Sequence, residues 1–123
     1  MYKRQLVTRV IYPGLKSHKQ FDLATKQHSC PDGNPVYGSM ISFELDQSID
    51  LDSFAKKLSI ITLAESLGGV KSLISCPYSM THASVPHDEK AELGITPNLL
   101  RFSVGIEHTD DLISALEFAM NHN

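Results

Sequence analysis

The sequence has few cysteines, little net charge and no long hydrophobic run, and each shortage argues against a class of protein. Its two cysteines, Cys30 and Cys76, form no CxxC pair and no framework, so we expect reduced thiols in a cytoplasmic protein. A net charge of −3 gives no electrostatic reason to expect nucleic acid or an anionic membrane as a partner. No apolar run approaches the roughly 20 residues that span a bilayer, and residues 1–5 lack the apolar stretch of a secretory signal.

Several familiar site motifs are missing as well. The six histidines show neither i,i+4 spacing nor a cysteine partner at finger spacing, so we predict no metal site. Ser66 and Ser103 lie outside any GxSxG context, which argues against a hydrolase nucleophile. No GxxxxGK[ST] pattern surrounds Gly68 and Gly69, so they do not form a phosphate loop.

What the sequence does contain is enough apolar material for one domain with a core, because 41% of its 123 residues are hydrophobic. Residues 7–11 are β-branched and extended, and elsewhere period-2 alternation or short apolar runs predict four strands. These are at 41–45, 60–63, 72–75 and 100–104. Helices are expected over 17–27 with Ser17 as the cap, after Asp50 or Asp52, over 86–93, and from Thr109 onward.

This order of elements predicts an α/β fold, although the regular βαβ run with long crossover helices is lacking. We therefore expect a small, mainly antiparallel sheet with helices packed on one face. Residues 29–37 carry turn-forming proline, glycine and asparagine and are predicted to form an exposed loop. We see no internal repeat that would divide the chain, and we treat residues 1–123 as one domain.

Three short segments could carry a binding site. Arg101 is on the polar side of its predicted strand, where a planar guanidinium could grip a carboxylate through two parallel hydrogen bonds, or could simply be solvated. Residues 65–69 are at a strand end, where ligand contacts are common, but they could also form a plain turn. Thr81 could donate a hydroxyl or cap a local turn, and we expect the neighbouring His82 to be structural.

Taken together and in this order, three motifs resemble the C-terminal end of the trans-sulfuration enzymes, the Cys/Met-metabolism family that uses pyridoxal 5′-phosphate. The motifs are Ala64-Glu65-Ser66-Leu67-Gly68-Gly69, Met80-Thr81-His82 and Leu100-Arg101-Phe102-Ser103-Val104-Gly105. Residues 10–18 look like the linker that enters the family's C-terminal domain. Lys19 replaces the usual proline there, the loop at 29–37 looks longer than in close relatives, and residues 1–5 match no motif.

The resemblance assigns roles to these residues. It implies that Arg101 binds the α-carboxylate of an amino-acid substrate and that Ser66 and Thr81 support it with hydrogen bonds. Glu65 would face the distal part of the substrate and set specificity, and Leu67 belongs to the same substrate-binding motif. An acidic residue at the position of Glu65 is seen in family members that handle cystathionine.

The resemblance also implies a missing partner. Family members are considerably longer, and their N-terminal part carries the cofactor lysine, the aromatic residue that stacks on the pyridine ring and the phosphate-binding residues. No lysine here stands in that setting, so we expect no catalytic residue in this chain and no activity from it alone. The expected parent is a homotetramer with pyridoxal phosphate, to which residues 1–123 contribute the small C-terminal domain.

Within the family the motifs are nearest to the cystathionine γ-lyases, and the cystathionine γ-synthases share them. The expected parent therefore cleaves or forms a C–S bond at the γ-carbon of an amino acid. An alternative of another class stays open: a free-standing domain that binds amino acids or a protein partner without catalysis.

Overall fold

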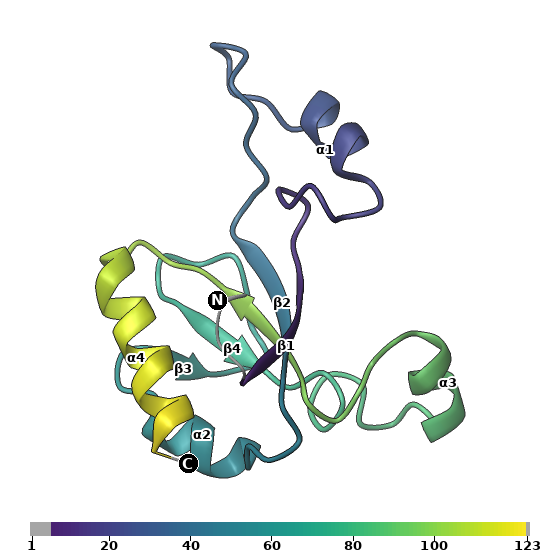
Figure 1. Cartoon of the computed structure of the whole chain (residues 1–123), viewed down its shortest axis with the longest axis vertical. Helices are drawn as coiled ribbons and strands as arrows, with labels where there is room; N and C mark the ends of the chain where they lie inside the picture. Colours follow the sequence, from purple (N-terminus) through teal and green to yellow (C-terminus); the bar gives the residue numbers. More distant parts are fainter. Residues whose placement is uncertain (1–5, 123) are drawn as a thin grey trace.

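A single five-stranded sheet organises the computed structural model, which describes residues 6–122 (Figure 1). The spatial order is β1-β2-β5-β4-β3, and every neighbouring pair is antiparallel except the parallel pair of β3 and β4. The predicted α/β class with a mainly antiparallel sheet is therefore confirmed. The strands are β1 (Val7–Ile11), β2 (Met40–Leu45), β3 (Thr62–Leu63), β4 (Leu73–Ser75) and β5 (Leu99–Ser103).

The core forms on one face of this sheet because alternate residues of each strand point to the same side. In the central pair, Phe43 of β2 lies opposite Leu100 of β5, and Ile74 of β4 lies opposite Phe102. All four side chains are buried. They belong to one hydrophobic cluster with Phe54 of α2 (Leu51–Lys57) and with the apolar stripe of α4 (Thr109–Asn121), which is Leu112, Ala115, Leu116, Ala119 and Met120.

Local capping explains where the two core helices begin. Of the two predicted caps of α2, Asp50 and Asp52, the structure has Asp50. Its side chain accepts a hydrogen bond of 3.1 Å from the backbone N–H of Asp52. The final helix starts at Thr109 as predicted, but its cap is His108, whose Nδ1 accepts from the N–H of Asp110 at 3.3 Å. The acidic first turn of each helix suits the positive end of the helix dipole.

Several boundary predictions were wrong. Ser17 does not cap the first helix, because successive turns occupy the chain before it and α1 (Phe21–Gln27) begins only after Gln20. The strand predicted over 60–63 is reduced to Thr62–Leu63, since the parallel pairing with β4 starts at Thr62. The extended segment at 7–11 pairs with β2 and adds a fifth strand to the four predicted.

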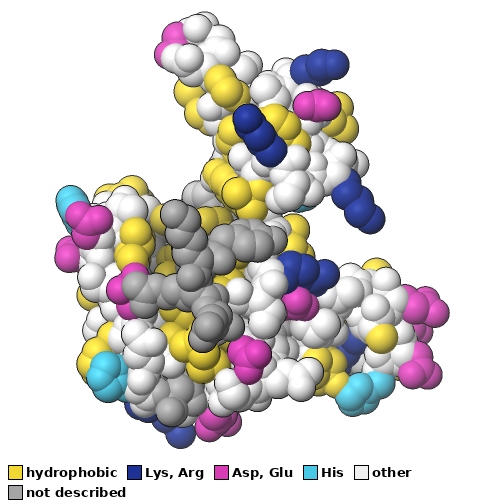
Figure 2. Space-filling model, viewed as in Figure 1, with side chains coloured by type: hydrophobic (Ala, Val, Ile, Leu, Met, Phe, Trp, Pro, Cys, Tyr) yellow, Lys and Arg dark blue, Asp and Glu magenta, His cyan; other side chains and the backbone are white. Residues whose placement is uncertain are grey.

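Among the helices in residues 6–122, α2 and α4 supply side chains to the core cluster on the sheet, so the prediction of helices on one face holds for these two. Helix α1 and the loop after it form a projecting lobe, and α3 (His87–Glu92) projects at another side (Figure 1). The α1 lobe is held by Tyr37, whose ring stacks on Phe21 at 5.9 Å and meets Tyr12 edge-on at 6.2 Å. Figure 2 shows this lobe standing clear of the rest of the molecule, with hydrophobic side chains near its base.

A buried lysine contributes to holding the α3 lobe. Lys90 is buried, its ammonium lies 4.4 Å above the ring centre of Tyr78, and it donates to the carbonyl of Ala83 at 3.3 Å. Tyr78 in turn lies within hydrogen-bond distance of His87 at the start of α3.

Both cysteines are free thiols, and no helix among residues 6–122 is long and apolar enough to cross a membrane.

Gly105, between β5 and α4, has no room for a side chain. A Cβ there would lie 2.6 Å from the backbone nitrogen of Ser72 and would also meet the carbonyl oxygen of Val70. Gly105→Ala is expected to lower the free energy of unfolding by about 1–3 kcal/mol, because backbone atoms must move apart. Urea denaturation measures the change.

Gly69→Ala is the matched control for this prediction. Gly69 does not have a positive φ, and the nearest atom to its added Cβ is the backbone nitrogen of Lys71 at 4.0 Å. This variant should keep the stability of the parent chain. Equal stability of the two variants would show that the close approach at Gly105 does not constrain the fold.

Candidate functional site

Arg101 occupies the centre of the sheet on the face opposite the core. Its neighbours Leu100 and Phe102 point into the hydrophobic cluster, so alternation places Arg101 on the other side of β5. Its cross-strand partners are two small residues, Ser42 in β2 and Ser75 in β4. The arginine is half-buried, which leaves its guanidinium within reach of a ligand.

The guanidinium already has one backbone partner. Arg101 Nη2 donates to the carbonyl oxygen of Glu65 at 2.7 Å, across 36 positions of sequence. Two residues further along β5, Ser103 Oγ accepts from the backbone N–H of Gly68 at 2.8 Å. The segment from Glu65 to Gly68, which we call the 65–68 turn, is thus held against the polar face of β5 at both ends.

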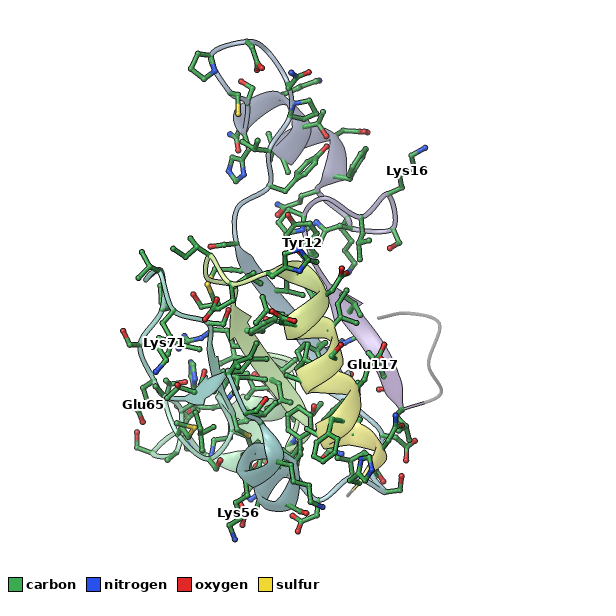
Figure 3. The ribbon with its side chains drawn as sticks, turned by 90° about the vertical axis from the view of Figure 1, so that its left-hand side faces the viewer. Tyr12, Lys16, Lys56, Glu65, Lys71 and Glu117 are labelled. Atoms are coloured by element: carbon green, nitrogen blue, oxygen red, sulfur yellow. The ribbon has the colours of Figure 1, made fainter. Side chains whose placement is uncertain are left out.

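The structure therefore brings the predicted residues of the 65–68 turn to Arg101. The side chains of Glu65, Ser66 and Leu67 are exposed, and Leu67 is 51% exposed although it is apolar. Figure 3 labels Glu65 and Lys71, which both belong to the loop between β3 and β4. These side chains are open to a ligand, whereas the turn's backbone carries the contacts to β5.

Thr81 is placed differently from the other predicted site residues. It is exposed in the turns that follow β4, and its Oγ1 lies 2.8 Å from His82 Nδ1. This contact joins two neighbouring side chains and is not the cap or turn hydrogen bond of the alternative interpretation. The roles of Thr81, Ser66, Glu65, Leu67 and Arg101 toward a substrate stay predictions.

Sequence reasoning missed two buried serines of the polar face. Ser103, considered only as a nucleophile, anchors the 65–68 turn and is 2% exposed. Ser75, 1% exposed, has a buried hydroxyl without a hydrogen-bond partner in the described part of the chain. The available signal was that each serine directly follows an apolar strand residue, Phe102 or Ile74, so that alternation puts it on the opposite face.

A second polar contact fixes the start of β4. Glu107 accepts two hydrogen bonds from Ser72, one from its N–H at 2.8 Å and one from its hydroxyl at 2.7 Å. The same hydroxyl accepts from the N–H of Gly105 at 2.8 Å. The hydrogen bonds from Ser72 favour the charged carboxylate and lower the pKa of Glu107 below its ordinary value.

The described residues do not by themselves fit pyridoxal phosphate. A Schiff-base lysine needs a sheltered position, whereas Lys71, the lysine nearest in sequence to the 65–68 turn, is exposed. The buried Lys90 faces Tyr78 and the carbonyl of Ala83 on the α3 lobe. A cavity of about 520 Å³ includes Lys19, but it is formed by β1 and the segment after it, without Arg101. No group of three metal-ligating side chains occurs in residues 6–122 either.

Comparison with known proteins gives a consistent result. Residues 1–121 match the family model of the Cys/Met metabolism PLP-dependent enzymes. A cystathionine γ-lyase of Dictyostelium discoideum is 47% identical over 120 residues, which cover 97% of this chain and 30% of that protein. A cystathionine β-lyase of Lactococcus lactis subsp. cremoris (strain MG1363) is 46% identical over 114 residues, 93% of this chain and 28% of that protein.

A solved structure agrees with these relatives. The cystathionine γ-synthase of Xanthomonas oryzae pv. oryzae in complex with cystathionine superposes with a TM-score of 0.85 at 40% identity, over 98% of this chain and 30% of that one. The chain thus spans less than a third of the length of these relatives. The family match starts at residue 1, so the prediction that residues 1–5 match nothing was wrong; they lie outside the described residues.

The lowered pKa of Glu107 predicts a pH-dependent contribution to stability. Because the folded-state pKa lies below the unfolded value, the stabilisation is complete above the ordinary pKa of 4.5 and is lost as the pH falls through the folded value. Glu107→Gln should therefore destabilise the chain at pH 7, and the gap to the parent should close as the pH is lowered to about 3. Thermal melts over this pH range measure the gap.

Glu92→Gln, at an exposed position in α3, serves as the control for charge removal alone. Asp32 and Asp46 also have lowered pKa values, each because a nearby backbone N–H donates to it, so Glu107→Gln keeps part of the acid sensitivity. A constant gap between parent and Glu107→Gln from neutral to acid pH would contradict the assignment.

Proposed function

Because the chain belongs to the Cys/Met-metabolism family of PLP-dependent enzymes, we propose that it is the C-terminal, substrate-carboxylate-binding domain of a trans-sulfuration enzyme. The observation that carries the proposal is Arg101. It combines a position at the centre of a rigid sheet, two small neighbours and an anchored guanidinium on the face left free by the core helices. We assign the parent to the cystathionine γ-lyase type, which acts on C–S bonds of cystathionine-like amino acids.

In this proposal Arg101 fixes the orientation of the substrate. Of the five N–H donors of a guanidinium, the contact to Glu65 uses one, so two parallel donors remain for a carboxylate. Holding the α-carboxylate also fixes the direction of the Cα–H bond, from which a proton must leave. Ser66 and Thr81 would add hydroxyl hydrogen bonds, and the exposed carboxylate of Glu65 would meet a distal ammonium group.

Pyridoxal phosphate would supply the electron sink for the reaction. Its lysine and phosphate-binding groups would come from a part of the enzyme outside these residues, and the chain alone would be inactive. Relatives named as β-lyase and γ-synthase keep those two reactions as alternatives within the family. The alternative of another class is a free-standing domain that binds amino acids without catalysis, and it shares the carboxylate site.

The first prediction tests Arg101 in this chain. L-cystathionine should cause saturable shifts in the ¹H–¹⁵N NMR spectrum at the 65–68 turn and around Arg101. Arg101→Ala should weaken this binding by about one to two powers of ten, the value of a charge-assisted hydrogen bond. Arg9→Ala removes an exposed arginine of β1 that pairs with Glu44 of β2, and this variant should bind like the parent. Unchanged binding by Arg101→Ala would leave Arg101 as a solvated strand residue.

The second prediction concerns the cofactor. After incubation with pyridoxal phosphate and dialysis, the chain should keep no visible absorption band of a lysine aldimine. The reason is that Lys71 is exposed, and the buried Lys90 faces Tyr78 and the carbonyl of Ala83 instead of the candidate site. A retained band that disappears when one particular lysine is changed to alanine would contradict the division of the site between two parts of the enzyme.

A further inference from the structure

The 65–68 turn is held by two side chains that leave the same face of one strand. Arg101 and Ser103 are alternate residues of β5, so their Cα atoms are separated by about 6.6–6.8 Å and both point to the polar side. Arg101 donates to the carbonyl of Glu65 at the start of the turn, and Ser103 accepts from the N–H of Gly68 at its end. The strand thus sets the position of the turn at two fixed points.

The two contacts differ in rigidity. Ser103 is 2% exposed and is paired on both sides of the strand, with Met40 of β2 and Leu73 of β4. Its short side chain loses little entropy when it accepts the hydrogen bond. Arg101 is long and half-buried, and its far end has no comparable support from the sheet. The rigid contact at Ser103 therefore holds the turn, while Arg101 follows the turn.

The 65–68 turn directs the guanidinium of Arg101. Gly68 has a φ of +76°, a left-handed conformation that favours glycine, and its N–H donates to Ser103 Oγ at 2.8 Å. Three residues earlier in the same segment, the carbonyl of Glu65 accepts from Arg101 Nη2 at 2.7 Å. One short hydrogen bond to a fixed acceptor restricts the last torsions of the arginine side chain, and this decides the direction of the remaining N–H donors.

We propose that Ser103 is a positioning residue of the carboxylate site, acting on Arg101 through the 65–68 turn. The proposal rests on the proposed function in so far as the guanidinium is taken to receive a substrate carboxylate. Ser103 itself touches no substrate. Without its hydroxyl, the turn loses its fixed end, the Glu65 carbonyl becomes mobile, and Arg101 samples several directions before it can bind two carboxylate oxygens.

Ser75 provides the matched control. It is a second buried serine on the polar face, in the strand next to β5 and directly opposite Arg101. Its hydroxyl has no hydrogen-bond partner in the described residues. Ser75→Ala therefore removes the same atom from the same environment without removing a contact of the turn, and it should leave the turn and Arg101 unchanged.

The experiment uses NMR on the 123-residue chain. In the parent, the Gly68 amide should be protected from hydrogen exchange, and Ser103→Ala should speed its exchange about tenfold, while Leu100 and Phe102 in the core keep their protection. The side-chain ¹⁵N signals of Arg101 should show larger motion in Ser103→Ala than in the parent or in Ser75→Ala. The dissociation constant for L-cystathionine should rise about fivefold in Ser103→Ala alone, the value of one neutral hydrogen bond.

Ser103→Thr keeps the oxygen and should restore the Gly68 protection, which separates the hydroxyl from a general packing effect. Free exchange of the Gly68 amide in the parent would overturn the proposal without any variant. So would an Arg101 side chain whose motion is the same in the parent and in Ser103→Ala. If the parent does not bind L-cystathionine at all, the proposed function fails, whereas the Gly68 and Arg101 measurements still decide whether Ser103 positions the arginine.

Discussion

The alternation of side chains along β5 is the constraint on which both the core and the candidate site depend. β5 lies at the centre of the sheet, between β2 and β4. A shift in its register would therefore break the pairing with both neighbouring strands. Leu100 and Phe102 pack in the hydrophobic cluster with the core helices, so Arg101 and Ser103 lie on the opposite face of β5. The burial of two apolar residues thus fixes the direction of two polar ones.

This coupling explains why the candidate site sits on a rigid support although its other residues are in loops. The 65–68 turn is held to β5 by Arg101 and Ser103, and the loop before α4 is held to β4 by Glu107. Exposed loop residues gain a defined position only through such contacts to a sheet. The two projecting lobes have supports of their own, an aromatic cluster for α1 and Lys90 for α3.

The sequence allowed much of the fold to be predicted because its strands alternate clearly and its core helices carry acidic first turns. The strands around Phe43 and Leu100 and the helix capped by Asp50 were predicted correctly for these reasons. The cap at Ser17 was wrong, because consecutive turns compete with the helix and no local pattern shows which of them wins. The turn at residues 65–68 was visible as glycine-rich, but its contacts to β5 were not, because they depend on a sheet register between segments about 36 positions apart.

The central claim is that Arg101 receives the α-carboxylate of a cystathionine-like amino acid while the 65–68 turn holds it in place. The most direct measurement is a crystal structure of the chain with L-cystathionine bound. The account predicts two guanidinium nitrogens of Arg101 at about 2.7–2.9 Å from the two oxygens of one carboxylate, with the contact to Glu65 retained. A carboxylate bound elsewhere, with Arg101 contacting only the Glu65 carbonyl and solvent, would contradict it.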